Sequence, residues 1–150
     1  MKIEDYLNSL PENILSGEDV QMPDNSFREI FNLVDLKKDD VFYHLGCGEG
    51  RGLSIALEEY NVKKATGIDN NQNKINIAKN HLMKKNLEVE LVCEDIESTE
   101  FEDATIILFW FADEKIINSM MKKFERLKSG TRIVTIWGPL PGCLPDKVRF

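Results

Sequence analysis

The chain has 150 residues, a formal net charge of −7, and 42% hydrophobic and 30% charged residues. This length and balance predict one soluble globular domain with a sizeable core and argue against a disordered chain. The acidic surplus disfavours a nucleic-acid partner, because binding to phosphates needs a positively charged surface.

The hydrophobic pattern predicts helices and strands that alternate along the chain. Apolar residues at helical spacing between residues 3 and 10 predict a first helix, and we interpret residues 1–22 as a lid segment on a single domain spanning 1–150. Helices are further predicted from Pro23 to Val34 and over residues 53–60, 72–85 and 113–127, and strands over 41–45, 65–68, 89–93, 104–111 and 132–137. This order predicts an α/β fold, Rossmann-like and doubly wound, with a mainly parallel sheet and helices on both faces.

Cysteine usage and apolar runs indicate the cellular setting. Three cysteines without a C-x-x-C spacing provide neither a disulfide framework nor a zinc motif, so no metal site is predicted. Cys47 lies among glycines and Cys93 in an apolar run, and both are interpreted as small buried residues. The longest apolar stretch, residues 104–112, is too short to cross a bilayer. We therefore expect a reduced, cytoplasmic protein with no membrane partner.

Glycine recurs at alternate positions after the first predicted strand. Residues 41–52 read VFYHLGCGEGRG. Glycine lets the backbone turn sharply and lie against a ligand, and ligands of open parallel sheets bind at the carboxyl ends of the strands. The spacing fits neither the dinucleotide fingerprint G-x-G-x-x-G nor the P-loop, which needs a lysine followed by serine or threonine. A cofactor of another kind is therefore expected at this turn.

Residues 41–50 resemble the first motif of the class I S-adenosylmethionine-dependent methyltransferases, usually an acid followed by x-G-x-G-x-G. Two further segments follow in the order of that family. Residues 66–69, TGID, end the second predicted strand with an acid, and residues 93–96, CEDI, follow the third. The resemblance runs from about residue 20 to residue 138 and implies S-adenosyl-L-methionine as the cofactor.

The resemblance also implies roles for single residues. Asp69 would hold both ribose hydroxyls, Asp95 would accept a hydrogen bond from the exocyclic amine of adenine, and Ile96 would pack on the adenine ring. On the residues alone, Asp69 could instead cap a helix that begins at Asn70 or Asn71, and Asp95 could be an ordinary turn residue. The residues expected to contact the cofactor are His44, Gly46, Cys47, Gly48, Glu49, Gly50, Asp69, Asn70, Asp95, Ile96 and Phe109.

Within the family the chain is most similar to the small archaeal protein-lysine methyltransferases, relatives of the non-SET histone-lysine enzymes. Pro23-Asp24, residues 62–65 and residues 127–132 carry this closer likeness. It implies that a methyl group is transferred to an amine, above all that of a protein lysine. The partner would be a protein or a small-molecule amine acceptor.

The end of the fourth predicted strand offers aromatic side chains to such an acceptor. Residues 108–112 read LFWFA, without the Asp/Asn-Pro-Pro-aromatic turn common in enzymes that methylate amide or base nitrogens. Aromatic faces attract a cation, and dehydration favours the neutral amine that attacks a methyl group. Trp110 and Phe111 are therefore the candidate catalytic residues. Alternatively, Phe109, Trp110 and Phe111 are only the end of a hydrophobic strand, and we favour this interpretation for Phe109.

His44 stands where the family usually has Asp or Glu, an acid that helps to hold the methionine ammonium of the cofactor. The substitution is either compensated by Glu49 or Asp24, or it weakens cofactor binding. A reference pKa of about 6.5 predicts that the imidazole gains a proton between about pH 8 and 5.5.

Two other functions stay open at this stage. The scaffold could serve a small-molecule or RNA methyltransferase, or a non-catalytic module that binds S-adenosylmethionine or S-adenosylhomocysteine. Residues 148–150 could begin only one of the two antiparallel strands that usually finish the family sheet. We therefore expect an incomplete C-terminal strand pair. Either the chain is truncated, or a partner covers the exposed sheet edge, for which a second copy in a homodimer is the candidate.

Overall fold

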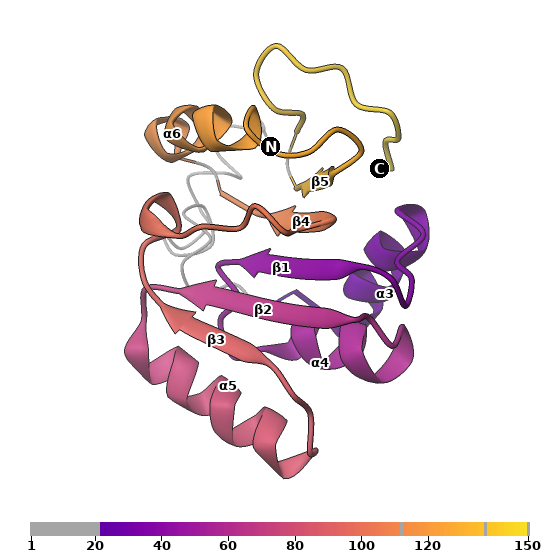
Figure 1. The fold of residues 1–150 in the computed structure, drawn as a ribbon, viewed down its shortest axis with the longest axis vertical. Coiled ribbons are helices and arrows are strands. Elements are labelled where there is room, and N and C mark those ends of the chain that lie inside the picture. The colour runs from indigo at the N-terminus through magenta and orange to yellow at the C-terminus, as the bar shows by residue number, and fades with distance from the viewer. Residues whose placement is uncertain (1–21, 112, 137, 150) are drawn as a thin grey trace, which may run out of the picture.

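A computed structural model describes residues 22–111, 113–136 and 138–149. The strands form one five-stranded, parallel sheet in the order β3-β2-β1-β4-β5 (Figure 1). Its members are β1 (Val41–Leu45), β2 (Lys64–Asp69), β3 (Glu90–Cys93), β4 (Ile106–Phe109) and β5 (Arg132–Thr135). The strand order reverses beside β1, and ligands of such sheets bind in the crevice at this point. The predicted fold class is confirmed.

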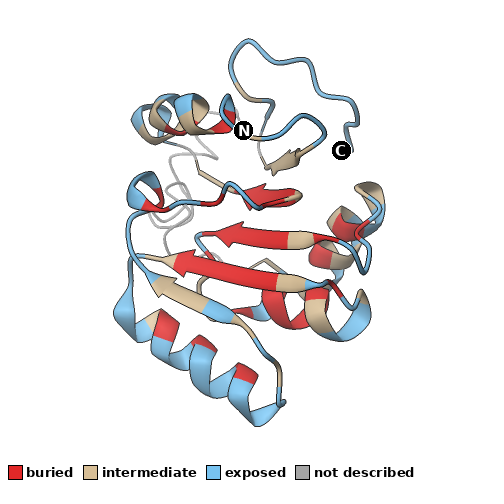
Figure 2. Cartoon of the chain, viewed as in Figure 1, coloured by how far each residue is buried: buried red, intermediate tan, exposed pale blue. Residues whose placement is uncertain are grey.

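Helices cover both faces of the sheet. They are α3 (Asp24–Leu33), α4 (Arg51–Glu59), α5 (Gln72–Lys84), α6 (Glu114–Phe124) and the 3₁₀ helix η1 (Ile96–Ser98). Buried side chains of α3, α4 and α5 share one core cluster with one face of the sheet, whereas those of α6 and η1 share a second cluster with the other face. Figure 2 shows β1, β2 and β4 as the buried centre, with the outer sides of α5 and α6 exposed.

The alternation of side chains along β1 divides these two clusters. Phe42 belongs to the first cluster and lies edge-on to Phe31 of α3, with ring centroids 5.2 Å apart. Tyr43 and Leu45 belong to the second cluster. His44 points to the same side as Phe42, as the two-residue period of a strand requires. The strand thus places His44 in the layer of α3 and α4.

Asp40 ties together the amino ends of the central strands, opposite to the candidate site. Asp40 is 6% exposed, and its carboxylate accepts hydrogen bonds from the Thr105 hydroxyl at 2.7 Å, the Lys37 amide at 2.8 Å and the Arg132 guanidinium. Burial raises the pKa of Asp40, but these hydrogen bonds outweigh it and the pKa is lowered. The network fixes the ends of β4 and β5 against β1, because it joins all three.

Most predicted elements are present, with shifted ends. The helix expected over 53–60 begins earlier, at Arg51, and the strand expected over 104–111 covers only Ile106–Phe109. The expected N-terminal helix and residues 112, 137 and 150 lie outside the described residues. Cys47 is buried as predicted, but the prediction for Cys93 was wrong. Cys93 ends the edge strand β3 and is exposed, since an edge strand is covered only in part.

The C-terminal segment runs back towards α3. Residues 138–149 contain no strand, and Lys147 donates a hydrogen bond to the Leu33 carbonyl at 3.0 Å. Arg149 lies 3.5 Å from the carboxylate of Glu29. Within the described residues β5 is therefore an edge of the sheet, and its pairing with a second copy stays a prediction. No helix in the described part of the chain is long and apolar enough to span a membrane.

Candidate functional site

The glycine loop turns between β1 and α4 at the centre of the sheet edge. Gly48 has a φ of +54°, a value that side chains rarely tolerate, and a Cβ built on it would meet no atom within 4 Å. Gly50 is the N-cap of α4 with a φ of +82°, and a Cβ there would lie 3.1 Å from the Cβ of Ala78 in α5. Packing against α5 therefore explains Gly50, whereas Gly48 leaves open space in which a ligand can approach the backbone.

The end of β2 holds this loop in place. The Ile68 carbonyl accepts hydrogen bonds from the amides of Gly46 at 2.7 Å and Cys47 at 3.0 Å. One oxygen of Asp69 accepts from the Gly48 amide at 2.9 Å, and the other from the Asn71 amide at 2.9 Å. Each carboxylate oxygen keeps a second lone pair, so Asp69 can accept further hydrogen bonds from a ligand beside Gly48.

The alternative role of Asp69 as a helix cap is wrong. The N-cap of α5 is Asn71, whose side chain accepts a hydrogen bond from the Lys74 amide at 3.2 Å. Asn70 is exposed between these two residues. Asp69 is thereby available for a role at the edge of the sheet.

The third segment of the site follows β3. Asp95 is exposed and precedes η1, and its carboxylate makes no hydrogen bond with another described residue. Ile96 is 7% exposed and belongs to the core cluster on the α6 side. The Glu94 amide donates to the Asp69 carbonyl at 3.2 Å. The two acids expected at the ribose and the adenine thus come from hydrogen-bonded neighbouring strands.

His44 is buried between the sheet and two helices. Its ring lies 5.7 Å from that of Phe27 and 6.2 Å from that of Phe42, and a Cβ on Gly52 would come within 3.1 Å of Nδ1. Nδ1 has no hydrogen-bond partner among the described residues. Burial lowers the pKa of His44 to about 4, so the ring is neutral at physiological pH. The sequence-based prediction of protonation between pH 8 and about 5.5 was wrong, because the reference value of about 6.5 ignores this burial.

Cys47, the residue between the first two glycines, is no nucleophile. Burial, together with the negative charge of Asp69, raises the pKa of its thiol to about 12. A thiolate is the reactive form of cysteine, so this side chain stays protonated and inert. Its sulfur packs against Gly67 of β2, where a Cβ would come within 2.7 Å. Cys47 therefore contributes shape and backbone to the loop.

The aromatic residues after β4 differ in their placement. Phe109 is 2% exposed and lies edge-on to Phe124 of α6, with centroids 5.3 Å apart. Phe111 is half-buried and stacks on Phe109 at 4.9 Å, and its Cζ would lie 3.2 Å from a Cβ on Gly46. Trp110 is half-buried. Phe111 thus reaches the glycine loop, and Phe109 supports it from the core.

An ion pair joins the glycine loop to α3, and sequence reasoning missed it. Arg51, the first residue of α4, donates to both carboxylate oxygens of Asp24 at 2.9 and 3.2 Å. The pKa of Asp24 is lowered, first through this hydrogen bond. Glu49 makes no hydrogen bond or ion pair with a described residue. No spacing signal predicts a pair separated by 27 positions, since only the packing of α3 on α4 brings them together.

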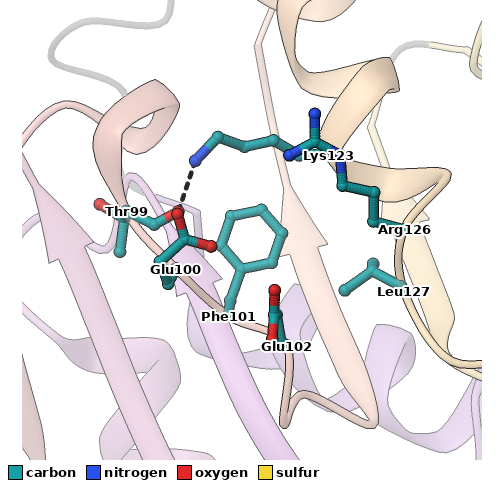
Figure 3. Close-up of a pocket in the computed structure, with 7 residues that line it drawn as sticks. All are labelled: Thr99, Glu100, Phe101, Glu102, Lys123, Arg126 and Leu127. Atoms are coloured by element: carbon teal, nitrogen blue, oxygen red, sulfur yellow. Dashed lines mark hydrogen bonds between the residues drawn. The ribbon is translucent and has the colours of Figure 1, made fainter.

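A pocket is lined mostly by residues between η1 and β4 and near the end of α6. Figure 3 shows it between the segment before β4 and the end of α6. Its lining residues are Thr99, Glu100, Phe101, Glu102, Lys123, Arg126 and Leu127. None of the residues predicted for the site lines it. In the described part of the chain, no group of three or more His, Cys, Asp or Glu side chains could hold a metal ion.

The residues at the sheet edge fit a nucleoside cofactor. Gly48 offers backbone next to open space, Asp69 offers carboxylate lone pairs beside it, and His44 offers a buried nitrogen without a partner. A glycine loop at the switch point of a parallel sheet, with an acid at the end of the next strand, defines a Rossmann-like cofactor-binding domain.

The chain belongs to the methyltransferase domain family, whose model matches residues 42–130. Its cofactor is S-adenosylmethionine. The chain is 30% identical to a protein-lysine N-methyltransferase of Saccharolobus islandicus, over 86% of this chain and 81% of that protein. A putative protein N5-glutamine methyltransferase of Methanocaldococcus jannaschii is 32% identical over 80% of this chain, which spans 63% of that protein.

Solved structures share the fold. An RNA methyltransferase from Salinibacter ruber, in complex with S-adenosyl-L-homocysteine, superposes with a TM-score of 0.72 at 20% identity, over 87% of this chain and 100% of that one. A geranyl diphosphate C-methyltransferase from Streptomyces coelicolor A3(2), also with S-adenosyl-L-homocysteine, gives a TM-score of 0.60 at 18% identity, over 72% of this chain and 42% of that one. At these identities the likeness concerns the fold alone.

Replacing the acid at the end of β2 should weaken cofactor binding. Asp69→Ala removes the acceptor beside Gly48, and we expect a loss of roughly 1.5–3 kcal/mol in the binding of S-adenosylhomocysteine, as for hydrogen bonds to a charged group. Titration calorimetry measures it. Glu88→Gln, an exposed change in the loop before β3, is the control and should bind like the parent. Unchanged affinity in a folded Asp69→Ala variant would contradict this role.

The burial of His44 should make stability depend on pH. A histidine with a lowered pKa in the folded state favours the unfolded state on protonation, so the free energy of unfolding should fall as the pH decreases from about 6.5 to about 4. The full contribution is about 3 kcal/mol. Urea unfolding between these pH values should show this loss in the parent.

The chain offers a matched control, since it has two histidines. His81 is exposed on α5, so His81→Gln should keep the pH dependence of the parent. His44→Gln should flatten it, whatever the stability of that variant at neutral pH. Equal slopes for the two variants would show that His44 does not cause the effect.

Proposed function

We propose that this protein transfers a methyl group from S-adenosylmethionine to the side-chain amine of a protein lysine. The 30% identity to a protein-lysine N-methyltransferase over most of both chains supports this acceptor. The observation that carries the proposal is the position of Phe111, whose ring stacks on Phe109 and reaches Gly46 of the glycine loop. An aromatic face at this point suits an amine that must approach the cofactor.

Cofactor binding would use the residues at the ends of three strands. The Gly48 backbone would lie against the ligand, and Asp69 would accept hydrogen bonds from the ribose hydroxyls. Asp95 would accept a hydrogen bond from the adenine amine, and Ile96 would pack beneath the adenine ring. A carboxylate suits the ribose because it can accept from two hydroxyls at once. When bound, S-adenosylmethionine supplies an electrophilic methyl group on a positively charged sulfur.

Two groups near the loop would face the methionine end of the cofactor. The neutral His44 offers Nδ1 as an acceptor or donor without adding a positive charge. Glu49 is a better candidate than Asp24 to balance the ammonium, because Asp24 is already paired with Arg51. Glu49 would supply the negative charge that His44 lacks.

The aromatic residues would prepare the acceptor for attack. A lysine ammonium is attracted to an aromatic face, while removal of water favours the neutral amine, the only form with a free lone pair. The lysine nitrogen would use this lone pair to bond the methyl carbon while the methyl–sulfur bond breaks and its electron pair stays on sulfur, which leaves S-adenosylhomocysteine. The methylated nitrogen would then release a proton to solvent. Phe111 and Trp110 would therefore act by orientation and dehydration, and no fixed base is required.

Acidic residues at the same edge favour a basic acceptor. They end or follow the strands β1, β2, β3 and β4, and the set comprises Glu49, Asp69, Glu94, Asp95, Asp113 and Glu114. Their negative potential attracts cationic segments and repels phosphates. A lysine-bearing protein surface is the acceptor that this charge suits best.

A protein glutamine amide is the second candidate acceptor. The likeness to a putative protein N5-glutamine methyltransferase favours it. Residues 108–111, LFWF, offer no Asp or Asn side chain to grip an amide, and for this reason we rank it below lysine. A non-catalytic module remains a third candidate, since the His44 position lacks the family acid.

Methyl transfer from labelled cofactor to a cell lysate tests the acceptor. We expect label on protein, and mass spectrometry of the digested proteins should locate it on lysine side chains. Label on glutamine would favour the second acceptor, and label on RNA would contradict both protein acceptors. Binding of S-adenosylhomocysteine without any transfer would indicate the non-catalytic module.

Truncation of Phe111 should separate catalysis from cofactor binding. In Phe111→Ala the rate of methyl transfer should fall about tenfold or more, as expected for a loss of about 1.4 kcal/mol in the transition state. The affinity for S-adenosylhomocysteine should change by about twofold or less. Steady-state kinetics and calorimetry measure the two quantities. The same measurements on Trp110→Ala decide which of the two rings lies nearer to the acceptor. For either variant, equal losses in rate and in cofactor affinity would indicate a structural role.

A further inference from the structure

The turn that carries Asp95 is closed by its own hydrogen bonds. The Asp95 carbonyl accepts from the Ser98 amide at 2.9 Å and from the Thr99 hydroxyl at 3.0 Å. The Thr99 hydroxyl also lies 3.3 Å from a carboxylate oxygen of Glu94. We call residues 94–99 the adenine-side turn. Because the Asp95 carboxylate has no partner of its own among the described residues, the backbone of this turn sets its position.

Helix α6 holds the adenine-side turn at two points. Lys123 donates a hydrogen bond to the Thr99 carbonyl at 2.6 Å, which Figure 3 shows as a dashed line. Ser119 donates to a carboxylate oxygen of Glu97 at 2.7 Å. Ser119 and Lys123 are one helical turn apart, so both reach the turn from the same side of α6.

Aromatic packing restricts where the Lys123 side chain can lie. Its Nζ lies over the Phe101 ring, 5.5 Å from the ring centroid, and Figure 3 shows the lysine side chain extending past that ring towards Thr99. Phe101 is 3% exposed and packs against Phe124 and Tyr43. The lysine is therefore held by a rigid core ring and by a charge-assisted hydrogen bond to the backbone of the turn.

We propose that Lys123, assisted by Ser119, is a positioning residue for adenine recognition. It holds the adenine-side turn so that the Asp95 carboxylate meets the exocyclic amine of the cofactor. The inference rests on the proposed function, because it assumes that Asp95 contacts the adenine. It goes further by assigning the selectivity for adenine to an anchor on α6 that does not touch the ligand.

Selectivity between two ligands tests this role. The probes are S-adenosylhomocysteine and its inosine analogue, which has a carbonyl oxygen in place of the exocyclic amine. The parent protein should bind the adenine ligand about tenfold or more tightly than the analogue, as expected for a hydrogen bond to a charged group. In Lys123→Met, which keeps much of the apolar stem, affinity for the adenine ligand should fall about fivefold to tenfold. Affinity for the inosine analogue should change about twofold or less, because Asp95 gives that ligand no favourable contact.

Three further variants serve as controls and as an independent test of the positioning role. Lys123→Arg retains the charge and the donor and should restore the selectivity, whereas Lys122→Met, an exposed change at the next position, should leave both affinities unaltered. Ser119→Ala should reduce selectivity in the same direction by about twofold to threefold, and it carries the test if Lys123→Met does not fold.

The outcomes distinguish this inference from the proposed function. Preserved selectivity in Lys123→Met and Ser119→Ala, or an equal loss of affinity for both ligands, would overturn the positioning role alone. A parent protein that bound neither ligand would overturn the cofactor assignment, and the inference with it.

Discussion

The hydrogen bonds between the end of β2 and the glycine loop are the constraint on which the candidate site depends. The Ile68 carbonyl accepts hydrogen bonds from the amides of Gly46 and Cys47, and the Asp69 carboxylate accepts one from the amide of Gly48. These bonds join the carboxyl ends of two neighbouring parallel strands. They hold the loop as a turn whose backbone at Gly48 lies open, and they place a carboxylate next to that backbone before any ligand arrives. This preorganisation lowers the entropy that binding would otherwise cost.

The surroundings of His44 explain why a neutral side chain can stand at this position. Phe27 and Phe42 pack around the ring, and Gly52 of α4 approaches Nδ1 closely. An ionised carboxylate among these groups would lose its hydration without an evident partner, which costs more than burying a neutral imidazole. The departure from the family pattern is thus matched by an apolar layer between β1 and α3. In the proposed site the negative charge would come instead from residues nearer to solvent, such as the half-buried Glu49.

Helix α6 connects the two sides of the candidate site. Phe124 packs on Phe109, which supports the aromatic end of β4, while Lys123 is bonded to the turn after β3. The helix therefore fixes the expected acceptor side and the expected adenine side to one rigid element. Sites built on helices and strands hold their geometry better than sites built on loops alone.

The sequence by itself determined the order of strands and helices, the glycine loop and the acids at the strand ends. Hydrophobic periodicity and glycine spacing are local properties, so they can be recognised without knowing the fold. The tertiary structure alone decided what lies around each side chain. The neutrality of His44, the pairing of Asp24 with Arg51, the exposure of Cys93 and the anchoring of the turn at Thr99 by Lys123 all depend on residues distant in the chain. Burial and pairing arise from packing between elements, and no single stretch of sequence contains that information.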